Sequence, residues 1–299
     1  MTRPADRISS PRITPPVPLG ADDVSVAVQL ACLLEASAPK PGNVCPSTRF
    51  RDCTYEDFLA SAAAIGIPFR GVAERPLGAT IRMAVEHTAR WTRANTNLGI
   101  ILLLAPLARA ALREGEGDLQ ARVGEVLDET TVEDAAEVYA AIRMANPGGL
   151  GRAPAQDVAA EPTVTLREAM SLAAERDAVA REYATGYATT FGKAVPLLDR
   201  ARRDALSWPD AVVEMFVALL AGGPDTLIAR KLGDDAAEAV SRRARTVLVA
   251  GGVRSVQGRK ALDAFDRELR DERNARNPGA TADLAAAAIF VHLIGGGRP

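Results

Sequence analysis

Residues 35–62, EASAPKPGNVCPSTRFRDCTYEDFLASA, gather charged side chains around a long break in an otherwise helical pattern. Two prolines flank Lys40, and each proline favours an extended conformation in the residue before it. A lysine held on such a stiff backbone is suited to binding a phosphate group. The alternative is that the prolines only end a helix, Gly42 turns the chain, and Lys40 is a solvated charge.

Other polar side chains stand where a helix is predicted to begin or one turn later. They are Asn95, Thr96, Asn97, Asp225, Arg230, Lys231 and Asp283. Such residues commonly cap helices, because their side chains satisfy the free amides of the first turn. Helix N-termini also bind anions, and aspartates could hold the Mg²⁺ that accompanies a polyphosphate. Capping and phosphate binding are both compatible with this pattern.

Other kinds of site find less support. The three cysteines form no C-x-x-C pair and the chain has two histidines, so a zinc site would lack ligands. No Ser-His-Asp or Cys-His arrangement is evident. The sequence NPGGLG follows no strand, so it lacks the context of a nucleotide-binding glycine loop.

The elements that must position these side chains are helices. Apolar residues recur at helical spacing in most of the chain, and alternation typical of strands is nearly absent. The pattern predicts helices over residues 21–37, 55–65, 76–91, 98–112, 131–145, 209–220, 225–231, 234–250, 256–271 and 281–294, with one long helix or two abutting ones over 165–204. We therefore predict a single all-α domain of ten or more helices over residues 21–299, after a flexible proline-rich tail of residues 1–20.

One further break covers residues 146–165, whose glycines and prolines exclude a helix. Structureless loops near this length are uncommon in compact domains and are often functional. We expect this loop to lie over an active site. The helix predicted at 98–112 is the most apolar and is expected to be buried on most sides, since it is too short and interrupted to span a bilayer.

Bulk composition sets limits on partners and location. With 36 basic and 38 acidic residues, the 299-residue chain has a formal net charge of −2, which gives no reason to expect nucleic-acid or membrane binding. The odd cysteine count and the missing apolar segment of a signal peptide favour the cytoplasm. A homodimer is plausible for a helical protein of this kind.

Several segments resemble a known family: LLEASAPKPGNV, DFLASA, NTNLGIILLLAPLA, AERDAVAREY, DTLIARKLG and NPGATADLAAAAIFV. In this order they are typical of triphosphoribosyl-dephospho-coenzyme A synthases. The resemblance covers residues 24–292 and is most specific in the Pro-Lys-Pro-Gly and C-terminal segments. It implies an all-helical Mg²⁺-dependent transferase that displaces adenine from ATP and joins the triphosphoribosyl group to dephospho-coenzyme A.

The resemblance also implies roles for individual residues. Lys40 and Arg230 would bind phosphates, and Asp225 and Asp283 would bind Mg²⁺. Glu35 or Asp52 would accept the acceptor's proton or stabilise the ribosyl cation.

Two segments differ from the family pattern as it occurs in the characterised synthases. Asn97-Leu98-Gly99 stands where they carry His-Lys-Gly, and Phe50-Arg51-Asp52 stands where they carry a histidine and a lysine before the acid. Such a divergent branch resembles proteins of archaea and methylotrophic bacteria. We therefore keep two alternatives: phosphoribosyl transfer or condensation in tetrahydromethanopterin or methanofuran synthesis, and a non-catalytic nucleotide-binding homologue.

Overall fold

A computed structural model describes residues 19–114, 117–271 and 273–299. Within these residues the chain is helical and contains no strand, which confirms the predicted all-α class. The elements are α1 (Ala21–Ser37), α2 (Tyr55–Ala64), α3 (Gly66–Arg70), α4 (Leu77–Ala89), α5 (Leu98–Leu112), α6 (Leu119–Asp128), α7 (Val132–Ala145), α8 (Leu166–Ala173), α9 (Ala178–Thr185), α10 (Val195–Arg203), α11 (Trp208–Gly222), α12 (Thr226–Leu232), α13 (Asp234–Val249), α14 (Val256–Leu269) and α15 (Gly279–Ile294). A π-helical turn covers Thr190–Ala194, and a 3-10 turn covers Gly252–Arg254. Most of the predicted tail, residues 1–18, lies outside the described residues.

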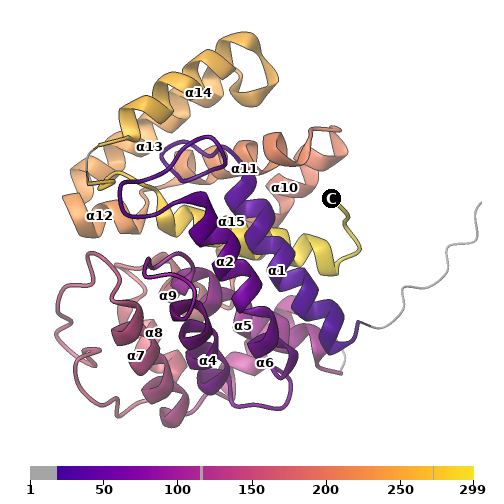
Figure 1. The fold of residues 1–299 in the computed structure, drawn as a ribbon, viewed down its shortest axis with the longest axis vertical. Coiled ribbons are helices and arrows are strands. Elements are labelled where there is room, and N and C mark those ends of the chain that lie inside the picture. Colours follow the sequence, from indigo (N-terminus) through magenta and orange to yellow (C-terminus); the bar gives the residue numbers. More distant parts are fainter. Residues whose placement is uncertain (1–18, 115–116, 272) are drawn as a thin grey trace, which may run out of the picture.

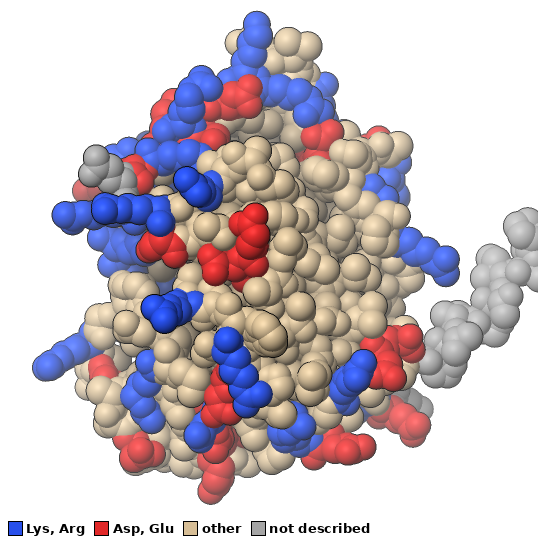
Figure 2. All heavy atoms as spheres, in the orientation of Figure 1, with Lys and Arg blue, Asp and Glu red and all other residues tan. Residues whose placement is uncertain are grey.

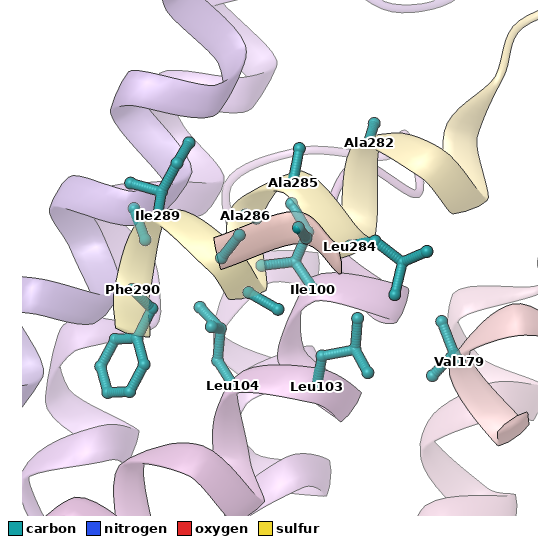
Figure 3. Packing of buried hydrophobic residues seen from close by; sticks show 14 of the residues in the cluster. Ile100, Leu103, Leu104, Val179, Ala282, Leu284, Ala285, Ala286, Ile289 and Phe290 are labelled. Carbon is teal, nitrogen blue, oxygen red and sulfur yellow. The ribbon is translucent and has the colours of Figure 1, made fainter. Parts of the chain in front are cut away.

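Helices α2 to α9 form one half of the molecule and α10 to α14 the other, with α1 and α15 between them (Figure 1). Helix α15 packs against α1 and α5 on one side and against α10 and α11 on the other. Its alanines let neighbouring helices approach closely, because interaxial distance depends on the side chains at the contact. Figure 3 shows Ala286 and Phe290 of α15 on the side of Ile100 and Leu104 of α5, whereas Ala285 and Ile289 point the other way.

The helix predicted at residues 98–112 forms as α5 and is almost wholly buried. It continues through Pro106, which has no N–H to donate to the Leu102 carbonyl four residues earlier. The hydroxyl of Tyr183 donates to that carbonyl instead, at 2.7 Å. Tyr187 donates to the next carbonyl, that of Leu103, at 2.8 Å.

The prediction of one long helix, or two abutting ones, over residues 165–204 is wrong. The chain instead forms α8, α9, the π-helical turn and α10. Asp177 caps the start of α9, and Gly186 ends that helix in the left-handed conformation with a φ of 62°. Two short helices, α3 and α6, were not predicted, although the apolar residues Leu119, Val123 and Val126 of α6 do follow a helical period.

Within the described part of the chain, no single helix is long and apolar enough to cross a membrane. Helices α11 and α12 meet that measure only together, across a bend of 55°.

Candidate active site

Asp225 joins the starts of two helices. Its Oδ1 accepts hydrogen bonds from the amides of Leu227 (2.9 Å) and Ile228 (3.1 Å), which caps α12. Its Oδ2 accepts from the amide and the hydroxyl of Thr281 in α15, both at 2.7 Å. Burial raises the pKa of Asp225, and these four hydrogen bonds oppose the rise. The capping alternative therefore describes Asp225, which is 2% exposed.

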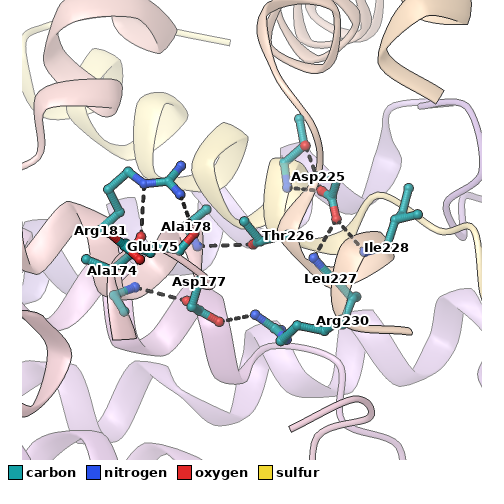
Figure 4. A network of polar contacts seen from close by, with 12 residues as sticks. Ala174, Glu175, Asp177, Ala178, Arg181, Asp225, Thr226, Leu227, Ile228 and Arg230 are labelled. Atoms are coloured by element: carbon teal, nitrogen blue, oxygen red, sulfur yellow. Dashed lines mark hydrogen bonds and ion pairs between the residues drawn. The ribbon is translucent and has the colours of Figure 1, made fainter. Parts of the chain in front are cut away.

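The start of α9 meets the same junction (Figure 4). Asp177 accepts from the amide of Ala180 at 3.0 Å and forms an ion pair with Arg230 of α12. The amide of Ala178 donates to the hydroxyl of Thr226 at 3.0 Å. Asp177 therefore both caps α9 and pairs with Arg230.

Asp283 connects α15 with the first turn of α5. Its carboxylate lies against Gly99, where the oxygens occupy the space that a β-carbon would need. Burial raises the pKa of Asp283 well above its usual range. Repulsion from Glu35, Asp177 and Asp225 acts in the same direction. The starts of α5, α9, α12 and α15 therefore meet at one group of carboxylates, which we call the acidic cluster: Glu35, Asp177, Asp225 and Asp283.

Lys40 lies inside the protein. Its ammonium group is 2.9 Å from Glu35 Oε1, and the two side chains are 1% and 3% exposed. Lys40 also donates to the backbone carbonyls of Glu35 and of Ala38, so three acceptors surround its three protons. The lysine thereby helps to cap the end of α1, where the amide of Ala38 also donates to the Glu35 carbonyl. The side chain of Lys40 thus points back toward the end of α1. A phosphate contact by Lys40 stays a prediction.

The polar residues before α5 differ in their contacts. Asn95 is exposed, and its Oδ1 accepts from the amide of Leu98 at 3.3 Å. Thr96 is buried and shares a hydrogen bond with Ser61 of α2. Asn97, 5% exposed, donates to the hydroxyl of Thr88 at 3.2 Å. These contacts fix the start of α5, and with it the position of Gly99 beside Asp283.

Lys231 is half-buried and lies close enough to Asp225 of the cluster to interact with its charge. Its ammonium donates to Asn277 Oδ1 at 2.9 Å. Burial lowers the pKa of Lys231, while Asp225, Asp271 and Asp52 oppose that change. Asp52 itself is exposed, in the loop before α2.

The loop of residues 146–165 also lies next to Arg230 and Lys231. A β-carbon on Gly149 would lie 3.3 Å from Arg230 Cβ and from Lys231 Cγ. The loop therefore covers part of α12 next to the acidic cluster, as its glycine content allows.

A hollow of about 410 Å³ lies beside Asp271, between the loop before α2 and the chain after α14. Its lining includes Arg49, Arg51 and Arg270. On this face of the molecule, acidic side chains near the centre have lysine and arginine side chains above and below them (Figure 2). Carboxylates and cations thus lie near each other, as a site for a metal-bound polyphosphate requires.

A model of the CitG family, described as ATP:dephospho-CoA triphosphoribosyl transferase, matches residues 21–299. The chain belongs to this family. The resemblance seen in the sequence is therefore confirmed over the whole helical part.

Individual members of the transferase family match over different lengths. The 2-(5''-triphosphoribosyl)-3'-dephosphocoenzyme-A synthase of Klebsiella pneumoniae is 28% identical over 284 residues, which cover 89% of this chain and 92% of that protein. A Pseudomonas syringae protein named as a probable synthase of the same product is 36% identical over 98 residues, and this match spans only 33% of each chain. A crystal structure from Archaeoglobus fulgidus, provisionally assigned as a triphosphoribosyl-dephospho-coA synthase, is 30% identical with a TM-score of 0.63. It covers 80% of this chain and 100% of that chain.

Magnesium, which the family resemblance implies, can be tested against the carboxylates. Among the described residues there is no group of three or more histidine, cysteine, aspartate or glutamate side chains placed to hold a metal ion. Asp225 already accepts four hydrogen bonds. Asp283 accepts none in the described part of the chain, so its carboxylate fits a metal that arrives with its own phosphate ligands.

Sequence reasoning did not assign Asp177 or Gly99 to this site. Asp177 stands directly before Ala178-Val179-Ala180, so the ordinary signal of an N-cap aspartate was present. It was obscured by the long helix predicted there. Gly99 gave no signal, because its role depends on a contact with a residue far along the chain.

Proposed function

We propose that this chain transfers a triphosphoribosyl group from ATP to the hydroxyl of a cofactor-precursor acceptor and releases adenine. Membership of the ATP:dephospho-CoA triphosphoribosyl transferase family supports the reaction type. The Klebsiella relative, matched over 92% of its length, is named for a triphosphoribosyl-dephospho-coenzyme A product. The observation that carries the proposal is the meeting of four helix starts at the acidic cluster, with Arg230 and Lys231 beside it.

The triphosphate would bind on the side of the acidic cluster where Lys231 lies. Lys231 is held by Asn277 and can reach a phosphate by exchanging one hydrogen bond for another. Arg230 keeps its pairing with Asp177 and adds positive charge. The exposed amide of Asn95 and the arginines of the 410 Å³ hollow extend the basic surface. Asn97 and Thr96 position the start of α5 from inside.

Mg²⁺ would supply charge neutralisation on the triphosphate, with Asp283 as the protein carboxylate that contacts it. Asp225 would serve as scaffold, since its hydrogen bonds hold α12 and α15 together. This division differs from the role that the resemblance implied for Asp225. It follows from the occupied lone pairs of that carboxylate.

In the transfer step, the bond between adenine N9 and ribose C1′ breaks while the acceptor hydroxyl forms a new bond to C1′. The ribose carries positive charge as adenine leaves, and the carboxylates of Glu35 and Asp283 stabilise that charge. Asp52, an exposed acid close enough to Lys231 to act on its pKa, accepts the hydroxyl proton. The proton then passes to adenine, so atoms and charge balance.

The deciding experiment is adenine release. Purified protein with ATP, Mg²⁺ and dephospho-coenzyme A should release adenine and form a product heavier by the triphosphoribosyl group, both measured by chromatography with mass spectrometry. Asp283→Asn should reduce the rate at least 100-fold, while Asp235→Asn, an exposed aspartate of α13, should leave it within twofold. Neither adenine nor product with the wild-type protein would exclude this donor and acceptor pair.

A second candidate is phosphoribosyl transfer or condensation in the synthesis of one-carbon carriers such as tetrahydromethanopterin or methanofuran. It is favoured by one observation: Leu98 at the start of α5 is apolar and buried, and the segment around Phe50 supplies arginines, Arg49 and Arg51, to the 410 Å³ hollow. A changed set of cations suits a different donor or acceptor. Repeating the assay with phosphoribosyl diphosphate and pterin or furan precursors separates the two candidates. Tight ATP binding without turnover in every arm would support the non-catalytic alternative.

A further inference from the structure

A cavity of about 500 Å³ borders the acidic cluster at Asp225 but lies on a different side of α15 from Asp283. Ala280, Thr281 and Leu284 line it from α15, whereas Asp283 turns toward Gly99 of α5. The other walls come from α9, the π-helical turn, α10 and α11. Its volume is typical of a pocket for a small molecule, for which about 300–1,000 Å³ is usual.

Three cations line this pocket without a carboxylate to neutralise them. Arg181 donates only to the carbonyls of Ala174 and Glu175, each at 3.0 Å. Lys193 and Arg200 are exposed, and within the described residues neither forms an ion pair or a side-chain hydrogen bond. The one acidic side chain in the lining is Asp225, whose four hydrogen bonds leave it no free acceptor. The pocket therefore carries a positive charge that an anion would balance.

The remaining lining is apolar or lacks side chains. Leu197, Leu219 and Leu284 supply apolar surface. Gly192 and Gly222 also line the pocket, and a β-carbon built on either would meet no atom within 4 Å. These glycines face open space, so the volume is not filled by neighbouring packing.

The backbone of the pocket wall formed by residues 187–194 has an unusual conformation. Tyr187 has a φ of 61°, a conformation that costs about 1–3 kcal/mol outside glycine. The π-helical turn Thr190–Ala194 follows and places Gly192 and Lys193 on the pocket. Buried Glu182 holds the turn by accepting from the amides of Thr189 (3.0 Å) and Thr190 (2.8 Å). Such π-turns are rare and occur frequently at functional sites.

We propose that this pocket is a second ligand site, separate from the transfer site, for a small phosphorylated molecule with an apolar body. The phosphate binds at Arg181, Lys193 and Arg200. The apolar part packs on the leucines of α10, α11 and α15. The site does not depend on the transfer reaction proposed above.

AMP is a suitable probe, because it combines one phosphate with a flat, weakly polar base. Its binding to the full chain is measured by calorimetry in EDTA, which removes the metal that the transfer site would use. We expect AMP to bind, and adenosine and ribose 5-phosphate to bind at least tenfold more weakly. Failure of AMP to bind at millimolar concentration would overturn the proposal.

Two variants locate the AMP. Lys193→Ala combined with Arg200→Ala should weaken AMP binding at least tenfold, and Gly222→Leu should weaken it further by filling the cavity. The matched controls are Arg203→Ala with Lys260→Ala, which remove two exposed charges elsewhere, and Gly124→Leu, at another glycine with open space around it. Both controls should keep the wild-type affinity and a wild-type circular dichroism spectrum.

The opposite pattern places AMP elsewhere. If Asp283→Asn abolishes AMP binding while the two pocket variants bind as wild type does, the nucleotide occupies the transfer site and the second-site proposal is wrong. A loss confined to the pocket variants supports it, whatever the outcome of the adenine-release assay.

Discussion

The carboxylate of Asp283 occupies the space beside Gly99 that any other residue would fill with its β-carbon. Asp283 stands in the second turn of α15 and Gly99 in the first turn of α5, so this contact sets how closely the two helix starts approach. Glycine is unfavourable inside a helix by about 1 kcal/mol relative to alanine. At this position the absent side chain makes room for a charged group.

Gly99→Ala should therefore move Asp283 and lower the rate of adenine release. A displacement of about 1 Å can cost on the order of 100-fold in rate. Gly124→Ala is the matched control, since it adds the same methyl group to a helix with no atom within 4 Å. Steady-state rates and thermal unfolding of both variants test the idea, which fails if Gly99→Ala retains the wild-type rate.

Asp283 should also destabilise the free protein at neutral pH. Its pKa is raised in the folded state, so the folded chain binds more protons than the unfolded chain above an ordinary aspartate pKa of about 3.9. The unfolding free energy then falls as pH rises through the window between the two pKa values. Asp283→Asn removes this term, and we expect a higher melting temperature at pH 8 but little change at pH 4.

The measurement is thermal unfolding from pH 4 to pH 8 in EDTA. A gain of about 1 kcal/mol corresponds to roughly 2–4 °C in a chain of this size. The exposed control Asp235→Asn should follow the wild-type curve throughout. Parallel curves for Asp283→Asn and the wild type would show that burial does not perturb this carboxyl.

The helices and the site were predictable from the sequence to different degrees. Helical period is a local property, and the segments predicted at residues 21–37 and 98–112 form with those bounds. The division of residues 165–204 was missed although Asp177 and Gly186 carry ordinary cap signals, whereas the pairing of Asp177 with Arg230, 53 residues away, has no local signal. Local propensity cannot report such a contact.

The same limit applies to the site. The sequence identified Asp225 and Asp283 at helix starts, and both lie in the acidic cluster. It could not distinguish their roles, since a capping aspartate and a metal-binding aspartate occupy the same sequence position. The difference lies in their neighbours. Thr281 donates hydrogen bonds to the second carboxylate oxygen of Asp225, whereas Gly99 has no side chain and leaves space for the carboxylate of Asp283.

A substitution of Lys40 tests whether this lysine stabilises the fold or binds a phosphate. Replacing it with methionine leaves the buried carboxylate of Glu35 without a partner, and breaking a buried pair in this way costs about 3–5 kcal/mol. Chemical denaturation should show that loss for Lys40→Met, whereas Lys260→Met, at an exposed lysine of α14, should stay within about 0.5 kcal/mol. Wild-type stability combined with weaker ATP binding would instead place the Lys40 ammonium on the ligand.

Tyr183 should stabilise the protein through the carbonyl that Pro106 leaves without a partner. The hydroxyl donates to Leu102 O at 2.7 Å, and both groups are buried. Tyr183→Phe leaves that acceptor unsatisfied, which costs about 1–3 kcal/mol. Denaturant unfolding of the single variant measures the loss.

A double-mutant cycle shows whether the proline is the cause. In a Pro106→Ala background the helix supplies an N–H for Leu102 O, so Tyr183→Phe should cost less there than in the wild type. Tyr187→Phe, which removes the neighbouring hydroxyl from Leu103 O, is the control and should depend less on residue 106. Equal costs for Tyr183→Phe in both backgrounds would mean that the hydroxyl does not replace the amide that proline lacks.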